Sequence, residues 1–437
     1  MNILTKFFSP ISLLVSIIIW LYVFYRSQIY WGGSLNQIYI FYHLLSFLLV
    51  FCSLISFSLN KTVKKYLIIS IFTIFFTFYS FEIYLSLNKK TLNIKNEKRL
   101  IYEKNGKKFD TRSSVEIYNE LSQKEKRVSL PLAPLINFYP NDSILPLSGM
   151  SNSKTVFCNE NGYYSIYQSD RYGFNNPDKE WDSEEIEYLL VGDSFTHGAC
   201  VNRPDDIASV LRAISKKSAL NLGWSANGPL IQFATLKEYL LPNVEKVIWI
   251  FYEGNDFDDL KNEMKNKKLD SYYKNPDYKQ SLMLKQKEID KLVKTKINVA
   301  LDPKNKIKGF IFLRNFRNFL ITHLNLKNQN NFETNQKKID LLADFVNILK
   351  YTKKLINKNN SELYFVFIPD LRVGKIKDDT LYNLIEKKLR EIDINFIDIK
   401  KVLKNEDSVK KFLPLGGGHL NRDGYKKIAE IVHKSSK

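Results

Sequence analysis

The sequence predicts an α/β protein with a parallel sheet covered by helices on both faces, preceded by three transmembrane helices. Two observations carry this prediction. The first 87 residues contain three long apolar segments with almost no charge. From Glu187 onward, short uninterrupted apolar runs alternate with stretches of helical periodicity, a pattern typical of buried parallel strands joined by helices.

The composition limits the classes of function. The 437 residues include 65 Lys and Arg against 46 Asp and Glu, which gives a formal charge of +19. The lysines are spread through Lys/Asn/Ile-rich stretches and no nucleic-acid-binding motif accompanies them, so we expect no nucleic-acid partner. The three cysteines, Cys52, Cys158 and Cys200, fit no metal-ligand spacing.

Residues 1–87 are predicted to be a membrane anchor. Its apolar segments, residues 7–24, 38–59 and 66–81, each reach or approach the ~20 residues that cross a bilayer. Tyr and Trp residues lie at their ends, as in the aromatic belts of membrane proteins. A cleavable signal peptide would give one short apolar run, so three consecutive runs argue against one.

The loop charges predict the orientation. Lys61, Lys64 and Lys65 lie between the second and third segments, which places that loop and the N-terminus in the cytoplasm. Three spans then put the rest of the chain outside the inner membrane of a bacterium, usually in the periplasm. Disulfides persist there, so Cys158 and Cys200 could be bridged; two free thiols are equally compatible with the sequence.

Residues 88–185 are predicted to be a stalk and lead-in segment. Residues 88–130 are charged and polar, with some helix near residues 115–121, and four prolines then space out an extended stretch. Residues 155–181 are rich in Tyr, Asn, Asp and Gly. This composition favours loops or short strands that pack on the domain ahead.

Residues 186–437 are predicted to form the α/β domain. Its strand-like runs are residues 188–191, 219–222, 247–252, 363–368 and 396–399. Its helical stretches are residues 206–216, 230–240, 338–356, 380–390 and 423–433. Residues 257–336 form an insertion with a charged helical stretch at residues 281–294 and an apolar-basic one at residues 309–324. We expect the apolar-basic stretch to pack on the α/β domain; an active-site lid and a membrane-surface helix are the alternatives.

The residues that could carry chemistry follow the predicted strands. Ser194 follows the first strand in a Gly-Asp-Ser turn, where it would lie at the carboxyl edge of the sheet unless it only caps the next helix. The turns after the second, third and fifth strands supply glycines, Asn255 and His419. Acyl transfer needs such a set, because it uses a nucleophile, a base and hydrogen-bond donors for an oxyanion.

In order and placement, these stretches resemble the SGNH, or GDSL-type, hydrolases. Gly192-Asp193-Ser194 is similar to the first sequence block of that family, Gly254-Asn255-Asp256 to the third, and His419 to the last. The resemblance implies a flavodoxin-like three-layer α/β/α sandwich that uses no metal or organic cofactor. It implies Ser194 as the nucleophile and His419 as the base. The implied oxyanion donors are the backbone N–H of Ser194, the side chain of Asn255 and a backbone N–H at Ala226 or Gly228.

The sequence departs from the family pattern at two positions. The second block of the family usually has a glycine where this sequence has Ala226, although a backbone N–H can serve from either residue. The family usually carries Asp three residues before its His, and here that position is Gly416. Either a Ser–His dyad is oriented by a carbonyl, or another carboxylate helps, with Asp398 as one candidate. His197 is expected to pack beneath the serine turn, and Asp193 to orient that turn through hydrogen bonds.

The predicted function is that of a membrane-anchored serine esterase or O-acyltransferase. It would act on acyl groups of glycans outside the membrane, and acetyl is the acyl group we expect. In this it is similar to bacterial membrane-anchored SGNH proteins linked to polysaccharide O-acetylation. The expected partners are the cytoplasmic membrane, an acylated glycan or other ester and, for a transferase, a membrane acyl-donor protein. The alternatives are a lipase or lysophospholipase, and a non-catalytic glycan-binding or assembly protein.

Overall fold

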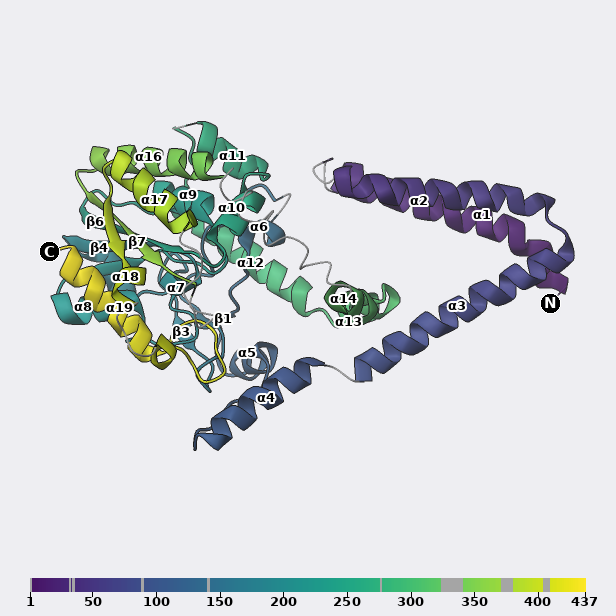
Figure 1. The fold of residues 1–437 in the computed structure, drawn as a ribbon, viewed down its shortest axis with the longest axis horizontal. Helices are drawn as coiled ribbons and strands as arrows, with labels where there is room; N and C mark the ends of the chain where they lie inside the picture. The colour runs from purple at the N-terminus through teal and green to yellow at the C-terminus, as the bar shows by residue number, and fades with distance from the viewer. Residues whose placement is uncertain are drawn as a thin grey trace. The chain divides into compact units, whose positions relative to one another are not determined.

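The computed structural model describes residues 2–30, 33, 36–87, 90–139, 142–275, 277–323, 341–370, 380–403 and 409–437. The chain forms two compact units, whose elements are labelled in Figure 1. Met1–Lys89 and Pro303–Gln329 make up the first unit, and Lys90–Asp302 and Asn330–Lys437 the second. The predicted boundaries at residues 88, 186 and 257 stay predictions, and the predicted ends at Leu324, Gln336 and Lys338 lie outside the described residues.

The first unit contains three long apolar helices, α1 (Asn2–Phe24), α2 (Asn36–Ile55) and α3 (Lys61–Leu87). A π-helical segment, Tyr25–Tyr30, continues α1. All three are long and apolar enough to cross a membrane. At 1.5 Å per residue, the 27 residues of α3 extend about 40 Å, which exceeds the ~30 Å hydrocarbon core of a bilayer.

Two helices of the insertion, α13 (Lys304–Ile311) and α14 (Arg314–His323), belong to this first unit. They pack on α3, where the ring of Phe316 lies 5.1 Å from that of Phe78. The expectation that this apolar-basic stretch packs on the α/β domain is therefore wrong. Phe316 and Phe319 of this stretch pack on aromatic side chains of α3, a partner that sequence periodicity does not identify.

The second unit is built on a five-stranded parallel sheet with the order β5-β4-β6-β7-β8. Its strands are β4 (Ile186–Gly192), β5 (Ala219–Asn221), β6 (Val244–Tyr252), β7 (Glu362–Ile368) and β8 (Asn395–Asp398). Counted along the chain, this order is 2-1-3-4-5, that of flavodoxin-like folds. The predicted α/β fold with a parallel sheet is confirmed.

The strands are uninterrupted apolar runs because both faces of the sheet are buried. Leu189, Val191 and Trp249 point into one core and Leu190 and Ile250 into the other. On the first face lie α9 (Pro229–Tyr239), α10 (Asp256–Glu263), α16 (Leu342–Lys358) and α17 (Thr380–Glu391); on the second lie α8 (Ile207–Ser215), α18 (Ile399–Leu403) and α19 (Arg422–Ser435) (Figure 1). The helices α11 (Lys267–Lys274) and α12 (Gln286–Leu301) follow α10.

The lead-in segment packs into the first of these cores. It contains α4 (Lys90–Lys104), α5 (Ser114–Ser122), α6 (Leu135–Phe138) and a small sheet of β1 (Val128–Ser129), β2 (Lys154–Val156) and β3 (Ile166–Gln168). Leu145, Leu147 and Phe174 are fully buried there. This packing holds the loop between β2 and β3 close to the carboxyl edge of the main sheet.

Candidate active site

Ser194 is the first residue of the short helix α7 (Ser194–His197), which begins directly after β4. The turn is tight, since a Cβ on Gly192 would lie 2.1 Å from the Thr196 Oγ1 atom. Asp193 caps α7 by accepting a hydrogen bond from the Phe195 N–H at 2.9 Å, which supports its predicted role in orienting the turn. The side chain of Ser194 is half-buried, so a substrate can reach its hydroxyl.

His419 meets Ser194 although the two lie far apart in the sequence. Its Nε2 atom is 2.9 Å from the Ser194 Oγ atom, within the range expected for a nucleophile and its base. The turn that carries His419 uses three glycines with positive φ, Gly416, Gly417 and Gly418, and ends where α19 begins. The structure therefore brings the two predicted catalytic residues together, while their catalytic role stays a prediction.

Glu160 is the residue that the sequence reasoning missed. Its Oε2 atom lies 3.0 Å from the His419 Nδ1 atom and also accepts the His419 backbone N–H at 2.6 Å. With Nδ1–H donating to Glu160, the Nε2 atom is left as the acceptor for the Ser194 hydroxyl. Glu160 therefore supplies the carboxylate that the sequence lacks at Gly416.

The surroundings of Glu160 favour its charged form. Burial opposes ionisation, but the hydrogen bonds and charge of His419 outweigh it and lower the pKa of Glu160 below its ordinary value. The Glu160 backbone carbonyl accepts the Tyr102 hydroxyl at 2.6 Å, which helps fix the loop. A carboxylate held in this way orients the imidazole and stabilises the imidazolium that forms when His419 takes a proton.

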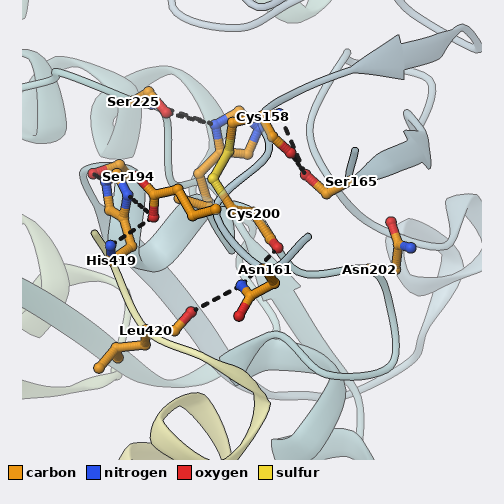
Figure 2. Close-up of a disulfide and its surroundings, with 12 residues drawn as sticks. Cys158, Asn161, Ser165, Ser194, Cys200, Asn202, Ser225, His419 and Leu420 are labelled. Atoms are coloured by element: carbon orange, nitrogen blue, oxygen red, sulfur yellow. Dashed lines mark hydrogen bonds and ion pairs between the residues drawn. A yellow bond between two sulfur atoms is a disulfide. The ribbon is translucent and has the colours of Figure 1, made fainter. Parts of the chain in front are cut away.

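A disulfide fixes the Glu160 loop to the loop behind Ser194. Cys158 and Cys200 are bonded, with their Cα atoms 4.9 Å apart and a sequence separation of 42. Figure 2 shows the disulfide beside Ser194 and His419. Asn161 adds a second link by donating to the Cys200 carbonyl at 3.0 Å. The pair Cys158–Cys200 was thus the signal in the sequence that could have pointed to Glu160, two residues after Cys158.

The candidate oxyanion donors follow three neighbouring strands. Ser194 follows β4, Ala226 follows β5 and Asn255 follows β6. Ala226 has a φ of 57°, and its backbone N–H makes no hydrogen bond with the described part of the chain. The Gly228 N–H instead donates to the buried Glu263 carboxylate at 2.5 Å. The prediction that Gly228 could be an oxyanion donor is therefore wrong, because its amide already donates to Glu263. Ala226 remains the candidate from this turn.

Asn255 is held by a buried acid. Its Nδ2 atom donates to the Asp259 Oδ2 atom at 2.6 Å, which uses one of its two N–H bonds and leaves the second. Burial raises the pKa of Asp259 to about 7. The amide is thus oriented by a neighbour one helical turn ahead in α10.

Two other predicted residues lie outside this arrangement. His197 is fully buried, stacks on Trp224 with ring centroids 4.8 Å apart, and has its pKa lowered to about 3 by burial. This agrees with the expectation that it packs beneath the serine turn. Asp398, the carboxylate suggested to assist His419, instead accepts the Tyr382 hydroxyl at 2.5 Å, so that suggestion is wrong.

The described residues also include a cluster with the composition of a metal site. Ligand atoms of Glu160, Cys200 and His419 lie within 4.8 Å of one another. The Cys200 sulfur is bonded to Cys158, so it cannot act as a thiolate ligand. Both His419 nitrogens already have partners within the site. The donor set therefore fits a proton relay better than a metal centre.

No protein-family model matches the sequence, and no curated protein matches it. Two of the solved structures that match are similar over 57% of this chain. A lipolytic protein of the G-D-S-L family from Desulfitobacterium hafniense DCB-2 matches over 99% of its own chain, with 13% identity and a TM-score of 0.31. The lipase/acylhydrolase from Enterococcus faecalis matches over 94% of its chain, with 12% identity and a TM-score of 0.32.

Proposed function

We propose that this chain is a membrane-anchored serine esterase or O-acyltransferase of the SGNH type. The observation that carries the proposal is the hydrogen-bonded chain from the Ser194 hydroxyl through His419 to Glu160. The non-catalytic alternative was motivated by the missing carboxylate at Gly416. Glu160 removes that motivation, because it supports the imidazole from another part of the chain.

The proposed reaction begins at Ser194. Its Oγ atom attacks the ester carbonyl carbon while the His419 Nε2 atom takes the hydroxyl proton. The carbonyl oxygen becomes an oxyanion, for which the N–H groups of Ser194 and Ala226 and the side chain of Asn255 are the proposed donors. The bond to the leaving alkoxide then breaks and His419 protonates it, which leaves an acyl group on Ser194.

The second half of the reaction decides between hydrolase and transferase. Water or a sugar hydroxyl loses a proton to His419 and attacks the acyl carbon, and the Ser194 oxygen leaves with the returned proton. We propose that the substrate is an acyl ester of an extracytoplasmic glycan, and that the acyl group is acetyl. For a transferase, a separate membrane protein would supply the acyl donor. Neither half of the reaction needs a metal or an organic cofactor.

The proposed location is the inner membrane, with the second unit on the extracytoplasmic side. The lysines at the start of α3 support this orientation by the positive-inside rule. The Cys158–Cys200 disulfide supports it as well, because disulfides persist in oxidising compartments. A reporter phosphatase that is active only after export, fused after Lys437, tests the orientation. An inactive but intact fusion would contradict it.

The activity is tested on the full chain in detergent or nanodiscs. A fluorophosphonate probe is expected to label wild type and not Ser194→Ala, with Ser215→Ala, on the far end of α8, as the matched control. Turnover of p-nitrophenyl acetate, butyrate, octanoate and palmitate then separates an acetylesterase from a lipase. Adding glycan acceptors shows whether the acetyl group goes to water or to sugar. An unlabelled, inactive wild type would favour the non-catalytic alternative.

A further inference from the structure

The helices α13 and α14 are joined to α3 by aromatic packing. Phe316 contacts both Phe78 and Phe81, with centroid distances of 5.1 and 5.9 Å. Phe319 meets Phe81 at 5.3 Å, and the Tyr79 hydroxyl donates to the Ile311 carbonyl at 2.8 Å. Aromatic pairs of this kind hold one face of the two helices against the last turns of α3.

Glu82 explains why α14 begins at this place. It lies in an apolar helix with 0% of its surface exposed, where an ionisable side chain is costly unless it is paired. Its carboxylate accepts the backbone N–H groups of Asn315 at 3.1 Å and Phe316 at 2.8 Å, and the Asn315 side chain at 2.9 Å. These are the unsatisfied first amides of α14, at the positive end of its dipole.

The position of Glu82 places this junction near one face of a bilayer. Glu82 follows Tyr66, the first residue after the lysines of α3, by sixteen residues, or about 24 Å at 1.5 Å per residue. A hydrocarbon core is about 30 Å thick, so α14 begins close to the boundary opposite those lysines.

The other face of the pair is apolar and exposed. Ile307, Ile311 and Phe312 are between 53 and 63% exposed, whereas Phe310 packs on Tyr79 of α3 at 5.4 Å. They belong to the same unit as the exposed apolar side chains of α3, such as Phe72 and Phe76. Exposed cationic side chains of the pair include Lys304, Lys308, Arg314 and Arg317. Exposed aromatic and aliphatic side chains with basic neighbours are typical of helices that lie in a membrane interface.

We propose that α13 and α14 form an interfacial membrane hairpin that inserts its apolar face into the outer leaflet of the bilayer. Lys308, Arg314 and Arg317 contact anionic lipid headgroups. A bilayer is favoured over a protein partner because the hairpin is docked on a helix that is itself long and apolar enough to span one. The inference rests on the proposed anchoring by α1–α3, and it gives the chain a second attachment to the same membrane.

The test measures insertion with a fluorescent label on single cysteines. In a Cys52→Ser background, without reductant so that the disulfide stays closed, NBD is attached to Ile311→Cys in the full chain. Phe72→Cys, in α3, is the positive control, and Leu284→Cys, an 89% exposed leucine of the second unit, is the matched negative control. Vesicles of phosphatidylcholine and phosphatidylglycerol carry doxyl-lipid quenchers. Quenching at residue 311 is expected to reach at least half of that at residue 72, with little at residue 284.

Each other outcome overturns part or all of the proposal. Quenching at residue 72 but not at residue 311 would show that α1–α3 insert and the hairpin does not. No quenching at either residue would remove the anchoring and the hairpin together. A label at residue 311 that is shielded from aqueous iodide yet not quenched by lipid would mean that a protein covers the face.

Two variants test the mechanism of docking and binding. Glu82→Leu should at least halve quenching at residue 311 and leave residue 72 unchanged, because the amides of Asn315 and Phe316 lose their acceptor. Unchanged quenching would refute the capping role. Vesicles without phosphatidylglycerol should also reduce quenching at residue 311. An equal signal in both vesicles would refute the contribution of anionic headgroups.

Discussion

The Oε2 atom of Glu160 lies 3.0 Å from the Nδ1 atom of His419, although the two residues are 259 positions apart in sequence. The contact joins the lead-in segment to the last turn before α19. It means that residues before the α/β sheet complete the proposed catalytic machinery.

Replacing Glu160 by Gln is expected to lower kcat by about 10²- to 10⁴-fold with a small change in KM. Glutamine keeps the size of the side chain but cannot stabilise the imidazolium of His419, and the analogous change in a protease triad costs about 10⁴. The measurement is steady-state turnover of p-nitrophenyl acetate by the full chain. Glu125→Gln, a half-exposed acid of the same segment that pairs with Lys154, is the control. A kcat within twofold of wild type would exclude Glu160 from the mechanism.

Gly418→Ala is expected to lower activity by about 10²-fold, because the new Cβ would lie 2.3 Å from Glu160 Oε2 and displace it from His419. Gly417→Ala is the matched control. It also has a positive φ, 76°, but nothing lies within 4 Å of its added Cβ. Both variants carry backbone strain, and Gly418, at a φ of 138°, carries more of it, so turnover is compared at a temperature where both remain folded. An equal loss of activity in both variants would mean that backbone strain causes the loss, and not the displacement of Glu160.

Asn255→Ala is expected to lower kcat by about 10²- to 10³-fold, the usual effect of removing one oxyanion donor. KM should change little, since the hydrogen bond forms mainly in the transition state. Asn262→Ala, an exposed asparagine on the same helix, should behave like wild type. A rise in KM with unchanged kcat would instead assign Asn255 to ground-state binding.

Opening the disulfide is expected to reduce both stability and activity. Replacing Cys158 and Cys200 by Ala removes a covalent link between residues 42 positions apart. The unfolded chain then gains conformational entropy, which destabilises the fold by about 2–4 kcal/mol. It also loosens the Glu160 loop, so kcat should fall at temperatures where the variant remains folded. Thermal unfolding and turnover, each compared with Cys52→Ala, measure the two effects. Full activity in the folded double variant would mean that the disulfide only stabilises.

Asp259 is expected to make the protein less stable as pH rises. Its folded pKa is raised from 3.8 to about 7, so the folded state holds a proton that the unfolded state has lost between these values. The stabilisation is complete below pH 3.8 and is lost as pH rises through 7. Asp259→Asn should therefore flatten the fall in melting temperature between pH 5 and 8. Glu263, raised to about 8, leaves a residual slope. An unchanged slope would refute the assignment.

Much of the sheet could be predicted because parallel buried strands leave a clear pattern. Residues 247–252 and 363–368 are uninterrupted apolar runs in the sequence, and they form most of β6 and β7. Ser194, Asn255 and His419 could be found because each follows a strand or opens a helix, so topology alone places them at one edge.

Features set by distant contacts could not be predicted. Glu160 has no local motif, and its role depends on a contact across 259 positions. The choice between Ala226 and Gly228 depends on whether Glu263, 35 residues after Gly228, takes its amide. The periodicity of residues 309–324 shows an apolar stripe but not its partner, which is Phe78 and Phe81 of α3.

The docking of α14 on α3 has a practical consequence for dividing the chain. A secreted fragment that begins at Lys90 would keep Phe316 and Phe319 but lose the rings that cover them. Such a fragment should aggregate or adhere to detergent, however stable its sheet is. Replacing residues 303–340 with a short polar linker is the route to a monodisperse soluble enzyme for crystallisation.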